Sequence, residues 1–184
     1  MSARPVPPRP GGVSPRLAEI LRVDHAGELA AVHIYRGHRA VFEAAGMTDA
    51  AARMAAFEDH EATHLKRFET LLTEGAVRPT LMAPLWRAAA FGLGVGAALM
   101  GEKAAHACTE AVESVIEEHY AGQIAEIAGR EPALAAELTA FRDDELAHRD
   151  QAVAEGAKSA PAYPLLAAVI RAGCKAAIAI SEKV

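Results

Sequence analysis

The sequence predicts an all-α protein: a four-helix bundle with a hydrophobic crossover segment and an extra C-terminal helix. Alanine is abundant, leucine, glutamate, methionine and arginine recur, and aromatic residues make up only 5% of the chain, a composition that favours helix. No stretch alternates with the period of two that a half-buried strand shows. At 184 residues the chain fits one domain that is long enough to bury a core.

Two helices are expected in the N-terminal half of the chain. Helical periodicity runs over 16–45, where Gly46 is the expected stop, and resumes over 48–74. Thr48 is the expected N-cap of this second helix, because its hydroxyl accepts a bond from a free amide of the first turn. Gly75 is its expected end, because glycine tolerates left-handed backbone.

The C-terminal half predicts two more long helices and a final apolar one. The first covers 102–128, and the second covers 132–156, because Pro132 suits the first turn of a helix. Pro161 and Pro164 then open an apolar helix that reaches the C-terminus. The four long helices form the expected bundle, and this last helix is additional to it.

The hydrophobic crossover at 81–101 joins the second and third long helices and carries Arg87 as its only charge. It is long enough to cross a bilayer if it is wholly helical, but its alanine and glycine content makes the hydropathy weak. Three interpretations stay open: packing within the bundle, lying in the membrane surface, or spanning the membrane. The C-terminal helix favours the membrane surface, because its apolar residues are interleaved with Arg171 and Lys175, which suit anionic lipid.

Composition also limits the rest of the chain. Residues 1–15 hold five of the ten prolines and two glycines, so we expect a disordered tail, not a secretory signal, before a single domain at 16–184. Cys108 and Cys174 show neither metal nor redox spacing, as expected in a reducing compartment. The net charge of −5 lacks the basic footprint of a nucleic-acid-binding protein.

Glutamate and histidine residues fall into two matching halves of the sequence. Each half has one helical glutamate followed, at nearly the same distance, by a Glu-x-x-His pair: Glu28, Glu61 and His64, then Glu113, Glu145 and His148. The two side chains of each pair lie one turn apart on one helix face, so both can reach the same metal ion. Four carboxylates and two imidazoles from four helices form the ligand set of di-iron and di-manganese bundles.

Charge balance favours a metal centre over solvated surface residues. Four carboxylates that face one apolar core repel each other and lose their hydration, and two divalent cations cancel that charge. Carboxylate and imidazole ligands suit iron or manganese, whereas no thiolate is placed to select zinc. One Glu-x-x-His is a weak signal, but two copies, each with a preceding glutamate, predict a two-metal site.

Several further runs resemble the demethoxyubiquinone hydroxylases in order and spacing, over nearly the whole chain from Ile20. The runs are RVDHAGE at 22–28, RPT at 78–80, PLW at 84–86, ACT at 107–109, AVE at 111–113, FRDDEL at 141–146 with His148, APAY at 160–163 and AGC at 172–174. Leu29 differs from the aromatic residue that is frequent in the family. No mitochondrial transit segment is present, so we expect a bacterial-type member.

This resemblance implies a ferritin-like di-iron monooxygenase, a 3-demethoxyubiquinol 3-hydroxylase that hydroxylates the ring of a polyprenylated demethoxyubiquinol in ubiquinone biosynthesis. Carried over by position, the six residues above are ligands of two Fe²⁺ ions, with Glu61 and Glu145 as bridges. O₂ is the implied co-substrate, and NADH is favoured over a reductase as the electron source. Because the substrate is lipid-soluble, we expect 81–101 and the C-terminal helix to line its access path. The resemblance also implies a lipid-binding accessory protein and a peripheral location on the cytoplasmic face of the cell membrane.

His119 and Tyr120 match a His-Tyr pair of the family and are candidates for catalysis. They would orient the quinone head or relay a proton or an electron, and packing in the core is the alternative. Asp24 and Asp144 are candidates to hold the outer nitrogen of a metal-bound histidine, which such imidazoles usually require; exposed helix acids are the alternative. The remaining histidines considered match no ligand position and are expected to be structural or exposed: His33, His38, His60 and His106.

The glycine-rich run at 92–97 fits the dinucleotide fingerprint Gly-x-Gly-x-x-Ala only superficially. It follows no predicted strand and belongs to no βαβ unit, so we reject a nucleotide site there.

Two other functions stay open. One is a rubrerythrin-like peroxidase or iron-oxidising protein, which needs no lipid-facing segment. The other is a non-catalytic quinone- or lipid-binding partner with a vestigial metal site, against which the complete set of six residues argues.

Overall fold

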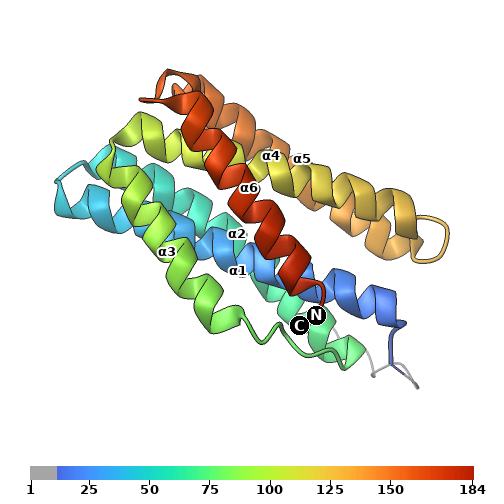
Figure 1. Cartoon of the computed structure of the whole chain (residues 1–184). Helices are drawn as coiled ribbons and strands as arrows, with labels where there is room; N and C mark the ends of the chain where they lie inside the picture. Colours follow the sequence, from blue (N-terminus) through green and yellow to red (C-terminus); the bar gives the residue numbers. More distant parts are fainter. Residues whose placement is uncertain (1–11) are drawn as a thin grey trace, which may run out of the picture.

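The computed structural model describes residues 12–184, and its helices follow the predicted order (Figure 1). They are α1 (Pro15–Ala44), α2 (Thr48–Gly75), α3 (Ala83–Leu99), α4 (Glu102–Ile127), α5 (Pro132–Ala154) and α6 (Tyr163–Ser181), with a short 3-10 turn at Ala157–Ser159. No strand occurs within the described residues.

The bundle consists of α1, α2, α4 and α5, in which α1 packs along α2 and α4 along α5 (Figure 1). The crossover helix α3 lies on α1, and α6 lies on α4 and also touches α1. The predicted all-α bundle with its crossover segment and additional C-terminal helix is therefore confirmed.

The predicted tail at 1–15 lies mostly outside the described residues. Within its last part, the hydroxyl of Ser14 accepts a hydrogen bond from the backbone N–H of Leu17 at 3.2 Å and caps α1. The helix begins at Pro15, one residue before the expected domain boundary. The Ser-Pro pair starts the helix there because it supplies both an N-cap side chain and a preset φ.

The turn between α1 and α2 corrects the predicted cap. Gly46 has a φ of 70°, and its N–H donates to the carbonyl of Glu43 at 3.1 Å. The N–H of Met47 donates to the carbonyl of Phe42 at 2.9 Å, which completes a Schellman turn. Met47 thus completes the turn after α1 and is at the same time the N-cap residue of α2. Thr48 is therefore the first residue of α2 and not its cap.

Gly75 is the last residue of α2, but the left-handed position follows it at Ala76, which has a φ of 53°. A Cβ on Gly75 would lie only 3.2 Å from a methyl group of Val13. Gly75 therefore lies in a tight apolar contact, and its backbone does not use the left-handed region.

Two glycines allow α3 to lie directly on α1. A Cβ on Gly94 would stand 2.2 Å from the carbonyl oxygen of Ile34, and one on Gly37 would stand 2.5 Å from that of Phe91. Real atoms do not approach so closely, so the two backbones meet only because both residues lack side chains. The glycine-rich run thus serves helix packing, in agreement with the rejection of a nucleotide site.

Gly94→Ala should lower the free energy of unfolding by about 2 kcal/mol, because the new methyl group overlaps the backbone of α1. Gly92→Ala, in the same helix, is the matched control because a Cβ there meets nothing within 4 Å. It should raise stability by about 0.5–1 kcal/mol, since alanine is the better helix former. Urea unfolding measures both; two variants of equal stability would show that α3 does not touch α1 at Gly94.

Candidate metal centre

The six glutamate and histidine residues predicted to bind metal converge inside the four-helix bundle. They are Glu28 on α1, Glu61 and His64 on α2, Glu113 on α4, and Glu145 and His148 on α5. All six side chains are buried. Their potential ligand atoms form two groups, and within each group all atoms lie within 4.8 Å of one another: Glu28, Glu61, His64 and Glu145, then Glu61, Glu113, Glu145 and His148. The two groups share Glu61 and Glu145, so the geometry offers two adjacent positions for ions.

The shared carboxylates have the free atoms that bridging ligands need. No oxygen of Glu61 or Glu145 has a hydrogen-bond partner within residues 12–184. The inner nitrogens crowd against them: His148 Nδ1 lies 2.8 Å from Glu61 Oε1, and His64 Nδ1 lies 3.3 Å from Glu145 Oε1. Buried acceptors without donors are costly, and two cations would satisfy them together. The donor set therefore fits two metal ions.

A tyrosine hydroxyl contacts each of the other two carboxylates. Tyr35 on α1 donates to Glu113 Oε1 on α4 at 2.5 Å, and Tyr120 on α4 donates to Glu28 Oε1 on α1. Both hydrogen bonds join α1 with α4, and each helix donates one of them. Sequence reasoning missed Tyr35, although it follows Glu28 at the spacing at which Tyr120 follows Glu113.

Burial and mutual repulsion shift the pKa values of the site. Burial raises the pKa of Glu28 and that of Glu113, and the neighbouring charge of Glu145 raises both further. Burial alone would lower the pKa of His148, but contacts with Glu145 and Glu61 outweigh it and raise the pKa to about 9. Without cations, glutamate and histidine side chains of the centre therefore keep protons, and metal binding would displace these protons.

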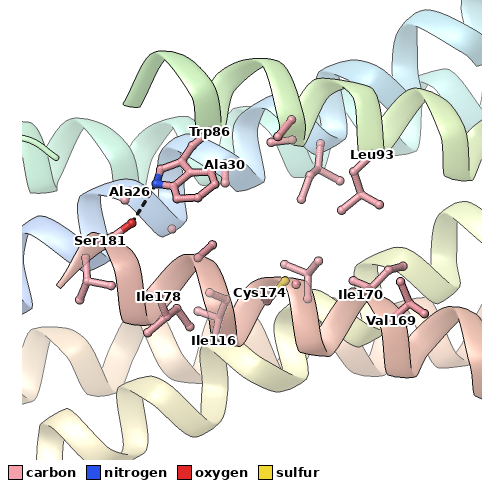
Figure 2. Close-up of a pocket in the computed structure, with 18 residues that line it drawn as sticks. Ala26, Ala30, Trp86, Leu93, Ile116, Val169, Ile170, Cys174, Ile178 and Ser181 are labelled. Carbon is pink, nitrogen blue, oxygen red and sulfur yellow. Dashed lines mark hydrogen bonds between the residues drawn. The ribbon is translucent and has the colours of Figure 1, made fainter. Parts of the chain in front are cut away.

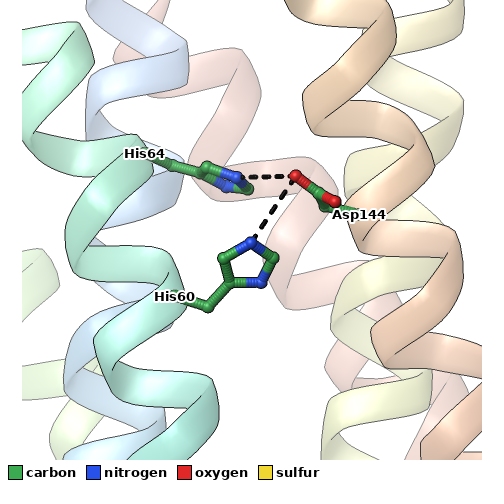
Figure 3. A group of neighbouring side chains, drawn as sticks. All are labelled: His60, His64 and Asp144. Carbon is green, nitrogen blue, oxygen red and sulfur yellow. Dashed lines mark hydrogen bonds and ion pairs between the residues drawn. The ribbon is translucent and has the colours of Figure 1, made fainter.

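The outer nitrogens of both histidines have partners. Asp144 Oδ2 lies 3.2 Å from His64 Nε2 (Figure 3), as expected for one of the two candidate aspartates. His60 Nδ1 lies 2.7 Å from His148 Nε2. His60 was expected to be structural or exposed, but it contacts the candidate centre directly. The signal was available, since His60 precedes one Glu-x-x-His pair as Asp144 precedes the other.

Asp24 does not hold a histidine of the metal centre, so that prediction is wrong. Its Oδ1 accepts a hydrogen bond from Gln123 Nε2 at 2.7 Å and lies 3.5 Å from His119 Nε2. One turn before Glu28, its side chain reaches α4 instead of the Glu-x-x-His helices. His119 belongs to this group, whereas Tyr120 contacts the metal centre; the catalytic role of both stays a prediction. Three other histidines belong to neither ligand group: His33, His38 and His106.

An apolar cavity of about 350 Å³ lies beside the centre; it is lined by α1, α3, α4 and α6 and is partly open (Figure 2). Gly27 and Val112 in its wall immediately precede Glu28 and Glu113. Trp86 Nε1 donates to Ser181 Oγ at 2.9 Å and links α3 with α6 at one end (Figure 2). The crossover and the C-terminal helix therefore line an apolar space next to the metal centre.

Large apolar side chains are exposed on α3, α6 and the chain next to them: Leu81, Leu85, Leu99, Met100, Leu165, Val169 and Ile180. By length and composition, α6 is apolar enough to cross a membrane, whereas α3 is a shorter apolar helix. Arg171 and Lys175 pair with α4 glutamates, at 2.6 Å to Glu110 and 3.2 Å to Glu118. Arg171 thus links α6 to a buried glutamate of α4, whereas the Lys175 pair is exposed; the sequence predicted neither contact.

Comparison with known proteins gives one consistent family. The family model described as "Ubiquinone biosynthesis protein COQ7" matches residues 15–181. The chain is 46% identical over 178 residues to the 3-demethoxyubiquinol 3-hydroxylase of Rhodospirillum rubrum, which covers 95% of this chain and 82% of that protein. It is 45% identical over 168 residues to the mitochondrial NADPH-dependent 3-demethoxyubiquinone 3-hydroxylase of Mus musculus, covering 89% and 76%. It is 36% identical over 183 residues to the mitochondrial 5-demethoxyubiquinone hydroxylase of Saccharomyces cerevisiae, covering 91% and 78%. The chain belongs to the COQ7 family, as its sequence motifs predicted.

Proposed function

We propose that this protein is a di-iron monooxygenase, a 3-demethoxyubiquinol 3-hydroxylase that acts on a polyprenylated demethoxyubiquinol in ubiquinone biosynthesis. One observation carries the proposal: four glutamates and two histidines converge beside an apolar cavity. The names of the relatives support the reaction and the substrate class. They favour this function over the rubrerythrin-like and the non-catalytic alternatives.

The proposed ligands of two iron ions are Glu28, Glu61, His64, Glu113, Glu145 and His148. When bound, the irons supply the activation of O₂ that ring hydroxylation requires. Glu61 and Glu145 are assigned as bridges because each belongs to both ligand groups and has no competing donor in the described chain. Both histidines would hold their ions through Nδ1, since Nε2 of each already faces an outer partner.

The substrate occupies the apolar cavity in this proposal. Its ring lies near Gly27 and Val112, whose neighbours are proposed ligands, and its isoprenoid tail extends between α3 and α6. The apolar walls keep water from the reacting centre. Tyr120 holds an oxygen of Glu28 and is placed to exchange a proton with it. His119 lies outside the ligand set, with its Nε2 3.5 Å from Asp24 Oδ1 and 2.8 Å from Gln123 Nε2. Orientation of the quinone head, or relay of a proton or an electron, is its proposed role.

A nicotinamide nucleotide is the proposed electron source, with a reductase as the alternative. The mouse and human relatives are named as NADPH-dependent, whereas the family resemblance favoured NADH, so both nucleotides belong in the assay. We place the protein peripherally at the cytoplasmic face of the cell membrane, because apolar side chains of α3 and α6 are exposed beside the cavity. A lipid-binding accessory protein is the proposed partner for substrate delivery.

Glu145→Ala should abolish ring hydroxylation, with a loss of at least about 100-fold, because both ions lose a bridging ligand. Product formation from a demethoxyubiquinol under O₂, with NADH or NADPH, measures the effect, and circular dichroism should show unchanged helix content. Glu43→Ala is the control, since Glu43 is exposed on α1 outside the centre. Hydroxylation that persists in Glu145→Ala would refute the site assignment.

The metal-free protein should lose stability as the pH rises from about 6.5 to about 9. The pKa of His148 is raised in the folded state to about 9, so its contribution is complete below pH 6.5 and is lost as the pH passes 9. The raised pKa values of Glu28 and Glu113 act with the same sign. We expect the melting temperature to fall by about 5–10 °C without metal and by less with iron bound. A pH-independent melting temperature of the metal-free form would contradict the crowded, protonated centre.

Leu165→Asp and Leu99→Asp should weaken binding to vesicles of phosphatidylcholine and phosphatidylglycerol about tenfold, because each replaces an exposed apolar anchor with a charge. Their iron content should stay at the wild-type level. Met47→Asp serves as the control, since Met47 is exposed at the turn between α1 and α2. Cosedimentation measures the partitioning; equal binding of all variants would rule out the proposed membrane face.

A further inference from the structure

The two Glu-x-x-His pairs are preceded by different residues that make equivalent contacts. His60 precedes Glu61 on α2, and Asp144 precedes Glu145 on α5. Each reaches across to the other helix: Asp144 Oδ2 lies 3.2 Å from His64 Nε2, and His60 Nδ1 lies 2.7 Å from His148 Nε2. The residue before each pair thus meets the outer nitrogen of the opposite histidine.

We propose that His60 is a positioning residue, which fixes the ring orientation and the tautomer of His148 as Asp144 does for His64. The inference rests on the proposed metal centre and adds to it a residue outside the six ligands. Partners of this kind hold metal-bound imidazoles in place and raise their basicity as ligands.

A single assignment of protons is compatible with two hydrogen bonds, His148 to His60 and His64 to Asp144, and with an ion-pair distance between His60 and Asp144. If His148 binds an ion through Nδ1, its neutral ring carries the proton on Nε2 and donates it to His60 Nδ1. His60 then carries its own proton on Nε2, which faces Asp144 Oδ2 at 3.6 Å. The same carboxylate oxygen accepts from His64 Nε2 (Figure 3). The two outer residues therefore form one connected chain between the two metal-binding histidines.

Packing supports the same role. The ring of His60 lies edge-on to that of His148, with centroids 4.8 Å apart, and 4.9 Å from that of His64. The His60 and Asp144 side chains are 41% and 42% exposed, whereas the two inner histidines are buried. The outer pair thus stands between the metal-binding histidines and solvent. Without the imidazole of His60, the Nε2–H of His148 would face water and the ring would be free to reorient.

His60, His64 and Asp144 are also close enough to hold an ion of their own. That arrangement would require His64 to give up its outer proton while its Nδ1 already binds an iron, because one imidazole would then bridge two cations. The hydrogen-bonded arrangement needs no such step. We therefore assign the group to positioning and not to a third metal site.

Titration of the metal-free protein with Co²⁺, followed by visible absorption, tests this role without relying on activity. His60→Phe keeps an aromatic ring but removes the acceptor, whereas His60→Asn keeps an acceptor oxygen close to the position of Nδ1. Wild type should bind two ions, and His60→Phe should bind one of them about 10–100-fold more weakly. His60→Asn should recover most of that loss. His33→Phe is the control, since within residues 12–184 the His33 imidazole bonds the carbonyl of Leu29 on its own helix and belongs to neither ligand group.

Equal Co²⁺ affinity of wild type and His60→Phe, or equal weakening in His60→Phe and His60→Asn, would overturn the positioning role. A third equivalent of Co²⁺ that disappears in both variants would also overturn it, in favour of a separate ion site. The predicted loss in a protein that binds two ions but does not hydroxylate would support the positioning role while contradicting the proposed reaction. A wild type that binds no Co²⁺ would refute both.

Discussion

The bundle has to hold four buried carboxylates against their mutual repulsion, and the rest of the site follows from this constraint. Burial removes the hydration that normally stabilises a carboxylate, and each charge raises the cost of the next. Glu28 and Glu113 each receive a tyrosine hydroxyl, which satisfies one oxygen but cancels no charge. Glu61 and Glu145 receive no hydrogen bond from the described chain. Only bound cations, or protons in their place, balance the negative charge of four buried carboxylates. The stability of the bundle and the binding of its proposed metal ions therefore depend on each other.

The same side chains connect the two halves of the bundle. The helices α1 and α2 pack along each other, as do α4 and α5, and a buried apolar cluster that includes Ile20, Phe68 and Leu138 joins the two pairs. Polar contacts also cross between the pairs: Tyr35 and Tyr120 join α1 with α4, and His60 and Asp144 join α2 with α5. Each half repeats the order glutamate, tyrosine and Glu-x-x-His. The polar centre therefore contributes to tertiary structure as well as to chemistry, because its contacts join the two pairs of helices in addition to the apolar core.

Sequence reasoning located the residues that repeat at helical spacing in both halves, but it missed or misassigned contacts of single residues that depend on a neighbouring helix or turn. The six proposed ligands repeat at helical spacing in both halves, so their convergence and the family followed from the chain alone. Thr48 does not cap α2 as predicted, because the start of α2 is set by the tight turn that ends α1. Asp24 was matched to the wrong partner because Gln123 lies on another helix. The repeat between the two halves of the sequence pointed to Tyr35 and His60. Their contacts, however, run to other helices of the bundle, and the spacing of residues along one helix does not show which neighbouring helix a side chain reaches.

The two apolar helices outside the bundle explain how a buried centre of this kind can serve a lipid-soluble substrate. The backbone of α3 rests on α1 where Gly94 allows contact, and Arg171 ties α6 to Glu110 on α4. The cavity between them thus has as its inner wall the same two helices that carry Glu28 and Glu113. Successive residues of a helix point about 100° apart, so a wall residue faces the cavity while the next glutamate faces the bundle interior. The apolar cavity and the charged centre thus face different sides of α1 and α4, so an apolar substrate and the proposed metal ions can lie close together in separate environments.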